Sequence, residues 1–157
     1  FYDLREQGIV ADYVIMMGYD EHFAGGEAGS VSSINYVKNG IAGMLENVPR
    51  EKLIGGVPFY TRLWTEAGDG TITSKAMGIA EEKRWVDNNQ VELTWQADIA
   101  QYYGEVQTSD GAQFLWMEEE RSLKEKMNVI RQNDLAGVAC WKLGFEDSAA
   151  WDSIQWN

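Results

Sequence analysis

The stretch that decides the fold is Tyr13-Val14-Ile15-Met16-Met17-Gly18-Tyr19-Asp20-Glu21-His22. Residues 13–17 carry no polar side chain other than that of Tyr13, and the stretch then ends in hydrogen-bonding and ionisable groups. A strand of an α/β fold that is covered on both faces has a continuous run of apolar residues. Ligands in such folds bind just beyond the carboxyl ends of the strands. The stretch therefore predicts a buried strand that delivers residues 19–22 to a functional site.

Length and composition indicate one globular unit with an acidic surface. The chain has 157 residues, of which 45% are hydrophobic, so it can bury a substantial core. Its 13 basic and 25 acidic residues give a net charge of -12, which repels phosphate backbones and anionic membranes. We therefore expect no nucleic-acid partner and no membrane partner. The single cysteine, Cys140, lies in an apolar run and is expected to be a core thiol rather than a nucleophile.

A parallel crossover unit is predicted after the first strand. Apolar residues recur at helical spacing over residues 34–48, and Ser32 or Ser33 can serve as the N-cap. Residues 53–60 form a second apolar run, and its late Pro58 indicates that the strand ends there. Strand, helix and strand in this order are typical of a parallel pair with a helical crossover.

The middle of the chain has the pattern of an antiparallel α+β segment. We predict a helix over residues 74–88, followed by strands near residues 91–95, 101–103 and 113–116. The turn residues Ser109-Asp110-Gly111 separate the last two strands. This pattern differs from the parallel one on either side and predicts an insertion.

The parallel pattern then resumes toward the end of the chain. Residues 122–125 read Ser-Leu-Lys-Glu, a capping box that is expected to open a helix. Residues 137–141 form a third apolar strand, which again ends in polar and aromatic residues. Three strands that end in such clusters predict one rim where all of the clusters meet.

The chemistry of that rim suits a carbohydrate. The face of a sugar ring packs on aromatic rings, and its hydroxyls need directional donors and acceptors. Each rim residue also has a plainer interpretation, because an aromatic near a strand end is often a core residue and an acidic residue can cap a helix. The side chains concerned are Tyr19, Asp20, Glu21, His22, Tyr60, Arg62, Trp64, Trp141, Glu146 and Asp147.

His22 is the only histidine of the chain. With two adjacent carboxylates it lacks the number and spacing of ligands that a zinc site needs, so we expect a hydrogen-bonded loop histidine and no metal. Glycine-rich phosphate loops and Gly-x-Ser-x-Gly elbows do not occur in the sequence. We therefore expect no cofactor.

Several of these residues match motifs of one known family. Met17-Gly18-Tyr19-Asp20 resembles the Met-x-Tyr-Asp motif on the sixth strand of glycoside hydrolase family 18, the chitinase family. Residues 49–60 with Arg62 resemble its seventh strand, and residues 137–147 resemble its eighth. The sequence Asp20-Glu21-His22 is most similar to a bacterial branch of spore-germination and cell-wall hydrolases.

The resemblance implies an α/β fold that is the C-terminal part of a TIM (β/α)8 barrel, about strands 6 to 8. Residues 1–64 and 117–157 would form the partial barrel, and residues 65–116 would form a small α+β insertion. Such a piece would leave two strand edges and its inner face without partners, so we expect it to self-associate. The resemblance also implies a cis peptide bond between Trp141 and Lys142.

The resemblance also implies a mechanism. Tyr19 would hydrogen-bond the N-acetyl group of the substrate while its carbonyl oxygen attacks the anomeric carbon, and Asp20 would hold the sugar in the same subsite. This is substrate-assisted, retaining hydrolysis, in which no carboxylate of the enzyme acts as nucleophile. The implied substrate is a polysaccharide that contains β-1,4-linked N-acetylglucosamine, either chitin or peptidoglycan.

Five further residues are expected to bind the substrate. Met17 would line the floor of the site and Trp141 would carry the reacting sugar on its ring. Tyr60 and Arg62 would contact neighbouring hydroxyls or carboxylates, and Glu21 would approach the substrate from the same rim. Glu21 as the general acid is an alternative, although its spacing does not show that it reaches the glycosidic oxygen.

One part of the family pattern is missing. The general acid of the family is a glutamate that closes an Asp-x-x-Asp-x-Asp-x-Glu motif on the fourth strand, and this spacing does not occur in the chain. We therefore expect an inactive C-terminal fragment of an extracellular, cell-wall or spore-associated enzyme. Two alternatives remain: a non-catalytic, lectin-like sugar-binding member of the same fold, and an acidic α/β interaction module without a sugar site.

Overall fold

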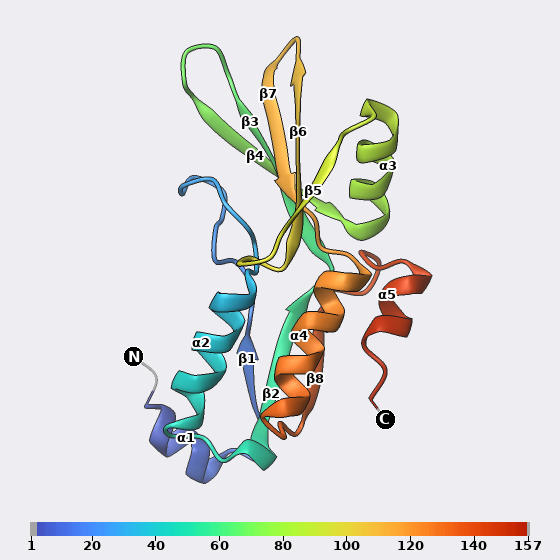
Figure 1. Ribbon diagram of the computed structural model, residues 1–157. Coiled ribbons are helices and arrows are strands. Elements are labelled where there is room, and N and C mark those ends of the chain that lie inside the picture. Colours follow the sequence, from blue (N-terminus) through green and yellow to red (C-terminus); the bar gives the residue numbers. More distant parts are fainter. Residues whose placement is uncertain (1–2, 157) are drawn as a thin grey trace.

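The computed structural model describes residues 3–156 and arranges them around two sheets (Figure 1). The three-stranded sheet lies with α1, α2 and α4 in one half of the molecule, and the five-stranded sheet lies with α3 in the other (Figure 1). Residues 1–2 and 157, which the expected barrel ranges include, lie outside the described residues.

The smaller sheet is parallel, with β2 in its centre. Its strands are β1 (Val14–Met17), β2 (Leu53–Pro58) and β8 (Gly137–Trp141). Met17 pairs with Gly56, and Pro58 pairs with Trp141, so the three strands end at one edge. The three parallel strands, their order along the chain and the end of β2 at Pro58 are confirmed.

Helices cover one face of this sheet. They are α2 (Ile34–Leu45) and α4 (Glu120–Gln132), and α5 (Ser148–Ser153) packs on α4. Helix α1 (Leu4–Val10) precedes β1, and a short 3-10 turn η1 (Arg50–Lys52) precedes β2. Helix α2 packs on β1 and β2, and α4 packs on β2 and β8. The side chain of Ser33 accepts a hydrogen bond from the backbone N–H of Tyr36 at 3.1 Å, so Ser33 is the N-cap of α2. The main core lies between these helices and the sheet.

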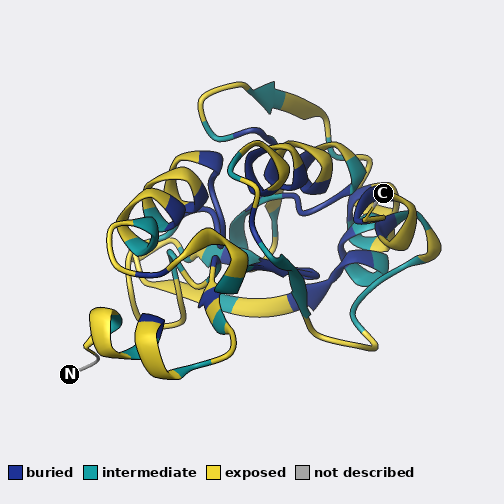
Figure 2. Cartoon of the chain, turned by 90° about the horizontal axis from the view of Figure 1, so that it is seen from below, coloured by how far each residue is buried: buried dark blue, intermediate teal, exposed yellow. Residues whose placement is uncertain are grey.

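The first strand is less buried than its sequence predicts. Met16 is 9% exposed and points toward the helices, whereas Ile15 and Met17 are 56% and 67% exposed. The expectation of a strand covered on both faces is therefore wrong, because β1 is an edge strand and helices cover only one face of the sheet. Helix α1, beside the N label in Figure 2, is also exposed over most of its surface.

The larger sheet is antiparallel, in the order β4-β3-β7-β6-β5. Its strands are β3 (Tyr60–Glu66), β4 (Ile72–Gly78), β5 (Leu93–Gln96), β6 (Gln101–Thr108) and β7 (Gly111–Trp116). Helix α3 (Ile79–Asn89) packs on β3 and β4. The three expected strands of the middle segment and the turn at residues 109–111 are confirmed.

The predicted helix over residues 74–88 is wrong in its first part. Residues 72–78 form β4, and each of them pairs with a residue of β3. The reason is tertiary, since the ladder with β3 satisfies the backbone groups of this segment better than an isolated helical turn would. The helix begins at Ile79, after the N-cap Gly78.

Helix α4 begins earlier than its capping box predicts. The N-cap is Glu119, whose side chain accepts hydrogen bonds from the backbone N–H groups of Arg121 and Ser122, both at 2.9 Å. The hydroxyl of Ser122 instead donates to Glu118 at 2.8 Å. The capping box at residues 122–125 is therefore wrong, because a glutamate three residues earlier already caps the helix.

Two further features concern membranes and the backbone. Within residues 3–156, the helices are too short or too polar to cross a membrane. The peptide bond between Trp141 and Lys142 is cis, as the family resemblance implies.

Candidate functional site

The carboxyl ends of the parallel strands bring the principal rim residues together. Tyr19 and Asp20 follow β1, and Tyr60 follows β2. The hydroxyl of Tyr60 donates a hydrogen bond to Oδ1 of Asp20. The rings of Tyr19 and Tyr60 meet edge to face, with centroids 6.3 Å apart. The structure thus joins the ends of two strands through one carboxylate and two phenols.

The two phenols stay protonated at neutral pH. Burial raises the pKa of Tyr60, and its hydrogen bond to Asp20 raises the pKa further. Burial also raises the pKa of Tyr19, with a second contribution from the charge of Asp20. The Tyr60 hydroxyl therefore keeps its hydrogen bond to Asp20, and the Tyr19 hydroxyl remains able to donate to a ligand oxygen.

Asp20 is held in an uncommon backbone conformation, with φ at 60°. Residues other than glycine seldom adopt this left-handed region, although aspartate does so more readily than most. Such conformations persist only where the surrounding structure fixes them, and they are frequent at functional sites.

Trp141 and Met17 present apolar surface at the same rim. Trp141 ends β8 and is 53% exposed, and Met17 ends β1 and is 67% exposed. The carbonyl oxygen of Trp141 accepts a hydrogen bond from the backbone N–H of Phe59 at 2.7 Å, which fixes its backbone beside the end of β2. A ring that is fixed and exposed at a strand end can serve as a platform for a sugar.

Arg62 lies two residues beyond Tyr60 on β3, so both side chains leave the same face of the strand. Its Nε is buried and has no hydrogen-bond partner within residues 3–156. A buried guanidinium nitrogen without a partner is costly. Arg62 therefore lies on the same face of β3 as Tyr60, with its Nε unpaired among the described residues.

Glu21 and His22 have local partners. The side chain of Glu21 accepts hydrogen bonds from the backbone N–H of Ser33 at 2.8 Å and from the Ser33 hydroxyl at 3.0 Å. Glu21 therefore fixes the start of α2, a role that the sequence did not indicate. Nδ1 of His22 lies 3.0 Å from the carbonyl oxygen of Glu27, which confirms the loop histidine. No group of three or more potential ligand side chains in residues 3–156 is placed to hold a metal ion.

The acidic residues after β8 are also engaged. Glu146 accepts a hydrogen bond from the backbone N–H of Gly144 at 2.7 Å. Asp147 caps α5 by accepting from the backbone N–H of Ala150 at 2.9 Å, and its other oxygen lies 2.6 Å from Nζ of Lys83. The helix-capping alternative is therefore confirmed for Asp147.

Cys140 has the character of an interior thiol. Burial raises its pKa to about 11, with a smaller contribution from the charge of Glu146. The thiolate is therefore scarce at neutral pH, and the thiol is a poor nucleophile.

Sequence reasoning missed two features of the site. Phe145 packs against Tyr60 with ring centroids 6.3 Å apart, and its place in the polar cluster after β8 was the available signal. A set of buried polar side chains also lies behind the rim and was not foreseen. Its members are Ser30, Ser32, Gln101, Glu118, Ser122 and Lys126.

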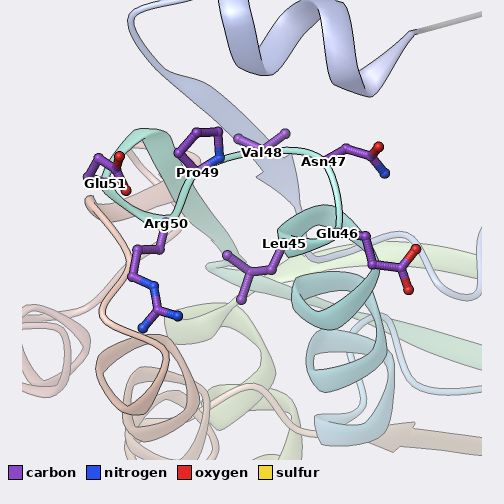
Figure 3. A pocket seen from close by; sticks show the side chains of 7 residues that line it. All are labelled: Leu45, Glu46, Asn47, Val48, Pro49, Arg50 and Glu51. Atoms are coloured by element: carbon purple, nitrogen blue, oxygen red, sulfur yellow. The ribbon is translucent and has the colours of Figure 1, made fainter.

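A hollow of about 390 Å³ lies elsewhere, in the turn between α2 and β2 (Figure 3). It is lined by residues 45–51, which precede the amino end of β2. Ligands of parallel sheets bind at the carboxyl ends of the strands. The rim with Asp20 and Tyr60 is therefore the better candidate site.

Comparison with known proteins identifies the family. The sequence model of the glycosyl hydrolases family 18 matches residues 1–146. The chain belongs to this family. It is 27% identical over 152 residues to the cortical fragment-lytic enzyme of Bacillus subtilis (strain 168), a match that covers 96% of the chain and 35% of that protein.

Two solved structures have the same fold. A chitinase from Chromobacterium violaceum ATCC 12472 matches with a TM-score of 0.90 and 25% identity, covering 98% of this chain and 47% of that one. A class V chitinase from Nicotiana tobaccum, in complex with NAG4, matches with a TM-score of 0.79 and 17% identity, covering 97% of this chain and 50% of that one. The chain thus spans at most half the length of each of these three proteins.

Proposed function

We propose that the chain is the C-terminal part of a (β/α)8-barrel glycosidase, with β1, β2 and β8 as the last three barrel strands. The five-stranded sheet with α3, which begins at Tyr60 rather than at residue 65, is then the insertion between the last two strands. Membership of the family and the parallel sheet with helices on one face support this assignment. An exposed opposite face is what a barrel interior leaves when other strands do not cover it.

The proposed reaction is the hydrolysis of β-1,4-linked N-acetylglucosamine polymers, in chitin or peptidoglycan. The observation that carries it is the carboxylate of Asp20, which accepts a hydrogen bond from the phenol of Tyr60 while the ring of Tyr19 packs against Tyr60, at the strand edge that also bears the exposed Trp141. The names of the two chitinases and of the cortical fragment-lytic enzyme support this substrate class. A spore or cell-wall location of the whole protein is proposed on the same ground.

In the proposed mechanism the acetamide oxygen of the substrate attacks the anomeric carbon, and the bond to the leaving sugar breaks. The leaving oxygen takes its proton from a general acid that this chain does not supply, so the isolated chain is proposed to be inactive. The protonated Tyr19 hydroxyl would orient the acetamide, and Asp20 would stabilise the charge that develops on it. The face of Trp141 would support the ring of the reacting sugar.

The test is made in the full-length protein, with soluble N-acetylglucosamine oligomers as substrate. Tyr60→Phe removes only the hydroxyl that donates to Asp20, and we expect kcat/KM to fall about tenfold to a hundredfold, the loss typical of a hydrogen bond to a charged group. Tyr103→Phe is the matched control, because the Tyr103 hydroxyl also donates to a carboxylate, that of Glu105 at 2.6 Å, within β6. Unchanged kcat/KM in Tyr60→Phe would contradict the proposed site.

The proposal also covers association of the isolated chain with itself. The outer edges of β1 and β8 have no strand partner among the described residues. The apolar side chains of Ile15 and Met17 are more than half exposed on the adjacent face. Exposed edges and apolar faces favour pairing with another copy. Light scattering on the isolated chain tests this, and the mass of one chain across the concentration range would contradict it.

A further inference from the structure

We propose that a buried chain of hydrogen bonds, from Lys126 through Glu118, Gln101, Ser30 and Ser32 to the carbonyl oxygen of Gly18, positions Tyr19 and Asp20. This inference rests on the proposed function of that site. Within the described residues, no hydrogen bond joins these five side chains to Tyr19, Asp20, Tyr60 or Trp141, so they are positioning residues. They come from three separate parts of the fold: α4 with the segment before it, β6, and the loop between β1 and α2.

The hydrogen-bond chain begins at a buried ion pair. The side chains of Lys126 and Glu118 are 1% and 0% exposed. Nζ of Lys126 lies 2.9 Å from both carboxylate oxygens of Glu118 and 2.7 Å from the hydroxyl oxygen of Ser122. An ammonium group carries three donors, and this site uses all of them. The pair is therefore satisfied and fixed in place.

The ion pair determines which way the amide of Gln101 faces. Nε2 of Gln101 donates to Oε2 of Glu118 at 3.0 Å. A carboxylate can only accept, so the amide nitrogen must face Glu118 and the amide oxygen must face the other side. On that side the hydroxyl of Ser30 donates to Oε1 of Gln101. Because Gln101 is completely buried, water cannot replace either bond.

Ser30 and Ser32 extend the hydrogen-bond chain to the rim. The hydroxyl of Ser30, having donated its proton to Gln101, accepts from the backbone N–H of Ser32 at 3.0 Å. The hydroxyl of Ser32 then donates to the carbonyl oxygen of Gly18 at 2.6 Å. Gly18 directly precedes Tyr19, and Asp20 follows with its left-handed backbone. The last bond therefore fixes the peptide that leads into the site.

A second contact holds the same loop. Nε1 of Trp64 donates to the carbonyl oxygen of Gly29 at 2.9 Å, next to Ser30. Trp64 lies on β3, the strand whose first residue, Tyr60, donates to Asp20. The loop from Gly18 to Ser32 is thus tied to the larger sheet at both of its ends. The larger sheet serves as a rigid support for the rim.

The test measures exchange of individual backbone amides by NMR. The N–H of Gly18 donates to the carbonyl of Gly56, and the N–H of Glu21 donates to the carbonyl of Val31, both at 3.0 Å. If the hydrogen-bond chain holds the peptide between Gly18 and Tyr19, Ser32→Ala and Gln101→Met should each accelerate exchange of both amides. The expected factor is about fivefold to tenfold, which corresponds to the loss of one buried hydrogen bond. The double variant exchanges no faster than the more affected single variant, because both substitutions break one chain.

The matched control is Ser153→Ala. The Ser153 hydroxyl is buried and donates to the carbonyl of Ala149 at 2.9 Å, so the same bond is lost in α5. It should leave exchange at Gly18 and Glu21 unchanged. Ser30→Ala breaks the chain without touching the ion pair and takes the place of Gln101→Met if that variant does not fold.

Two results would overturn the proposal. The first is exchange at Gly18 and Glu21 that responds to Ser32→Ala but to neither Gln101→Met nor Ser30→Ala. The second is an effect of Gln101→Met that is equal across all amides, which indicates a loss of global stability. Binding of N-acetylglucosamine oligomers to the full-length protein is measured in parallel, and we expect weaker binding in both variants. If the variants accelerate exchange at Gly18 and Glu21 as expected but the wild type binds no sugar, the proposed function is refuted and the positioning role of the hydrogen-bond chain still stands.

Discussion

Lys126→Met removes the charge of one member of the buried ion pair and tests its energetics. The variant leaves the Glu118 carboxylate in the core with hydrogen bonds from Ser122 and Gln101 only. Loss of one partner of a buried pair costs about 3 to 5 kcal/mol. Burial raises the pKa of Glu118, so the orphaned carboxyl can take up a proton. We therefore expect the lower end, about 3 kcal/mol.

The assay is urea unfolding at one fixed protein concentration, because association would also shift the transition. The control is Lys124→Met, which removes the same charge from an exposed position of the same helix and should cost less than about 0.5 kcal/mol. For a chain of this size the expected loss lowers Tm by about 6 to 12 °C. Equal unfolding free energies for the two variants would refute a stabilising role for the pair.

The pair can also be tested by coupling. In the double variant Glu118→Gln with Lys126→Met neither side chain is charged, so the loss should be at least about 1 kcal/mol smaller than the sum of the two single losses. Strict additivity would show that Lys126 and Glu118 act independently, which the distance of 2.9 Å between them contradicts.

Three further predictions concern buried groups. Gly18→Ala should destabilise the fold by about 1 to 3 kcal/mol in the same unfolding assay, because its Cβ would lie 2.5 Å from the backbone oxygen of Gly56. The control is Gly43→Ala inside α2, where a Cβ meets nothing within 4 Å, and this variant should be neutral or stabilising. Burial raises the pKa of Glu82 well above 4.5, so the folded chain keeps a proton that the unfolded chain releases, and stability falls as the pH rises. Glu82→Gln cannot release this proton, so the Tm of the variant relative to that of the wild type should rise from about pH 5 to pH 8. A Tm difference between the two proteins that does not change with pH would contradict the prediction. The pKa of Cys140 in the folded chain is about 11, so its thiol should react with iodoacetamide far more slowly in the folded chain than in the chain unfolded in urea. The expected difference in rate is on the order of a hundredfold at pH 8.

The parallel sheet could be predicted from the sequence because its signals are local. Residues 53–58 and 137–141 lie in apolar runs, and each forms a strand close to the expected bounds. Parallel strands that alternate with a helix end on one edge, so the meeting of Asp20 with Tyr60 followed from topology alone. The burial of the first strand could not be predicted, because apolar composition does not reveal how many faces are covered.

The error at residues 74–78 has a different cause. Ala76 and Met77 precede a true amphipathic helix, and both residues are compatible with its pattern. Their backbone instead pairs with Thr61 and Arg62 of β3. The sequence predicted no strand after Tyr60, so the partner strand of this hairpin was missed. Local propensity differences of a few tenths of a kcal/mol per residue are small beside a seven-residue ladder of hydrogen bonds.

The residues that hold the site are harder to predict than those that form it. Ser30 and Gln101 are 71 residues apart in the chain, and Ser32 and Gly18 are 14 apart, so periodicity does not connect them. One local signal existed, since Lys126 stands between Leu123 and Met127 on the apolar side of α4, where an unpaired lysine would be costly. A charge at a core position of a helix requires a partner elsewhere, and here the partner is the carboxylate that orients Gln101. A substitution on β6, which contributes no side chain to the rim, should therefore alter the peptide before Tyr19 as directly as a substitution in the loop itself.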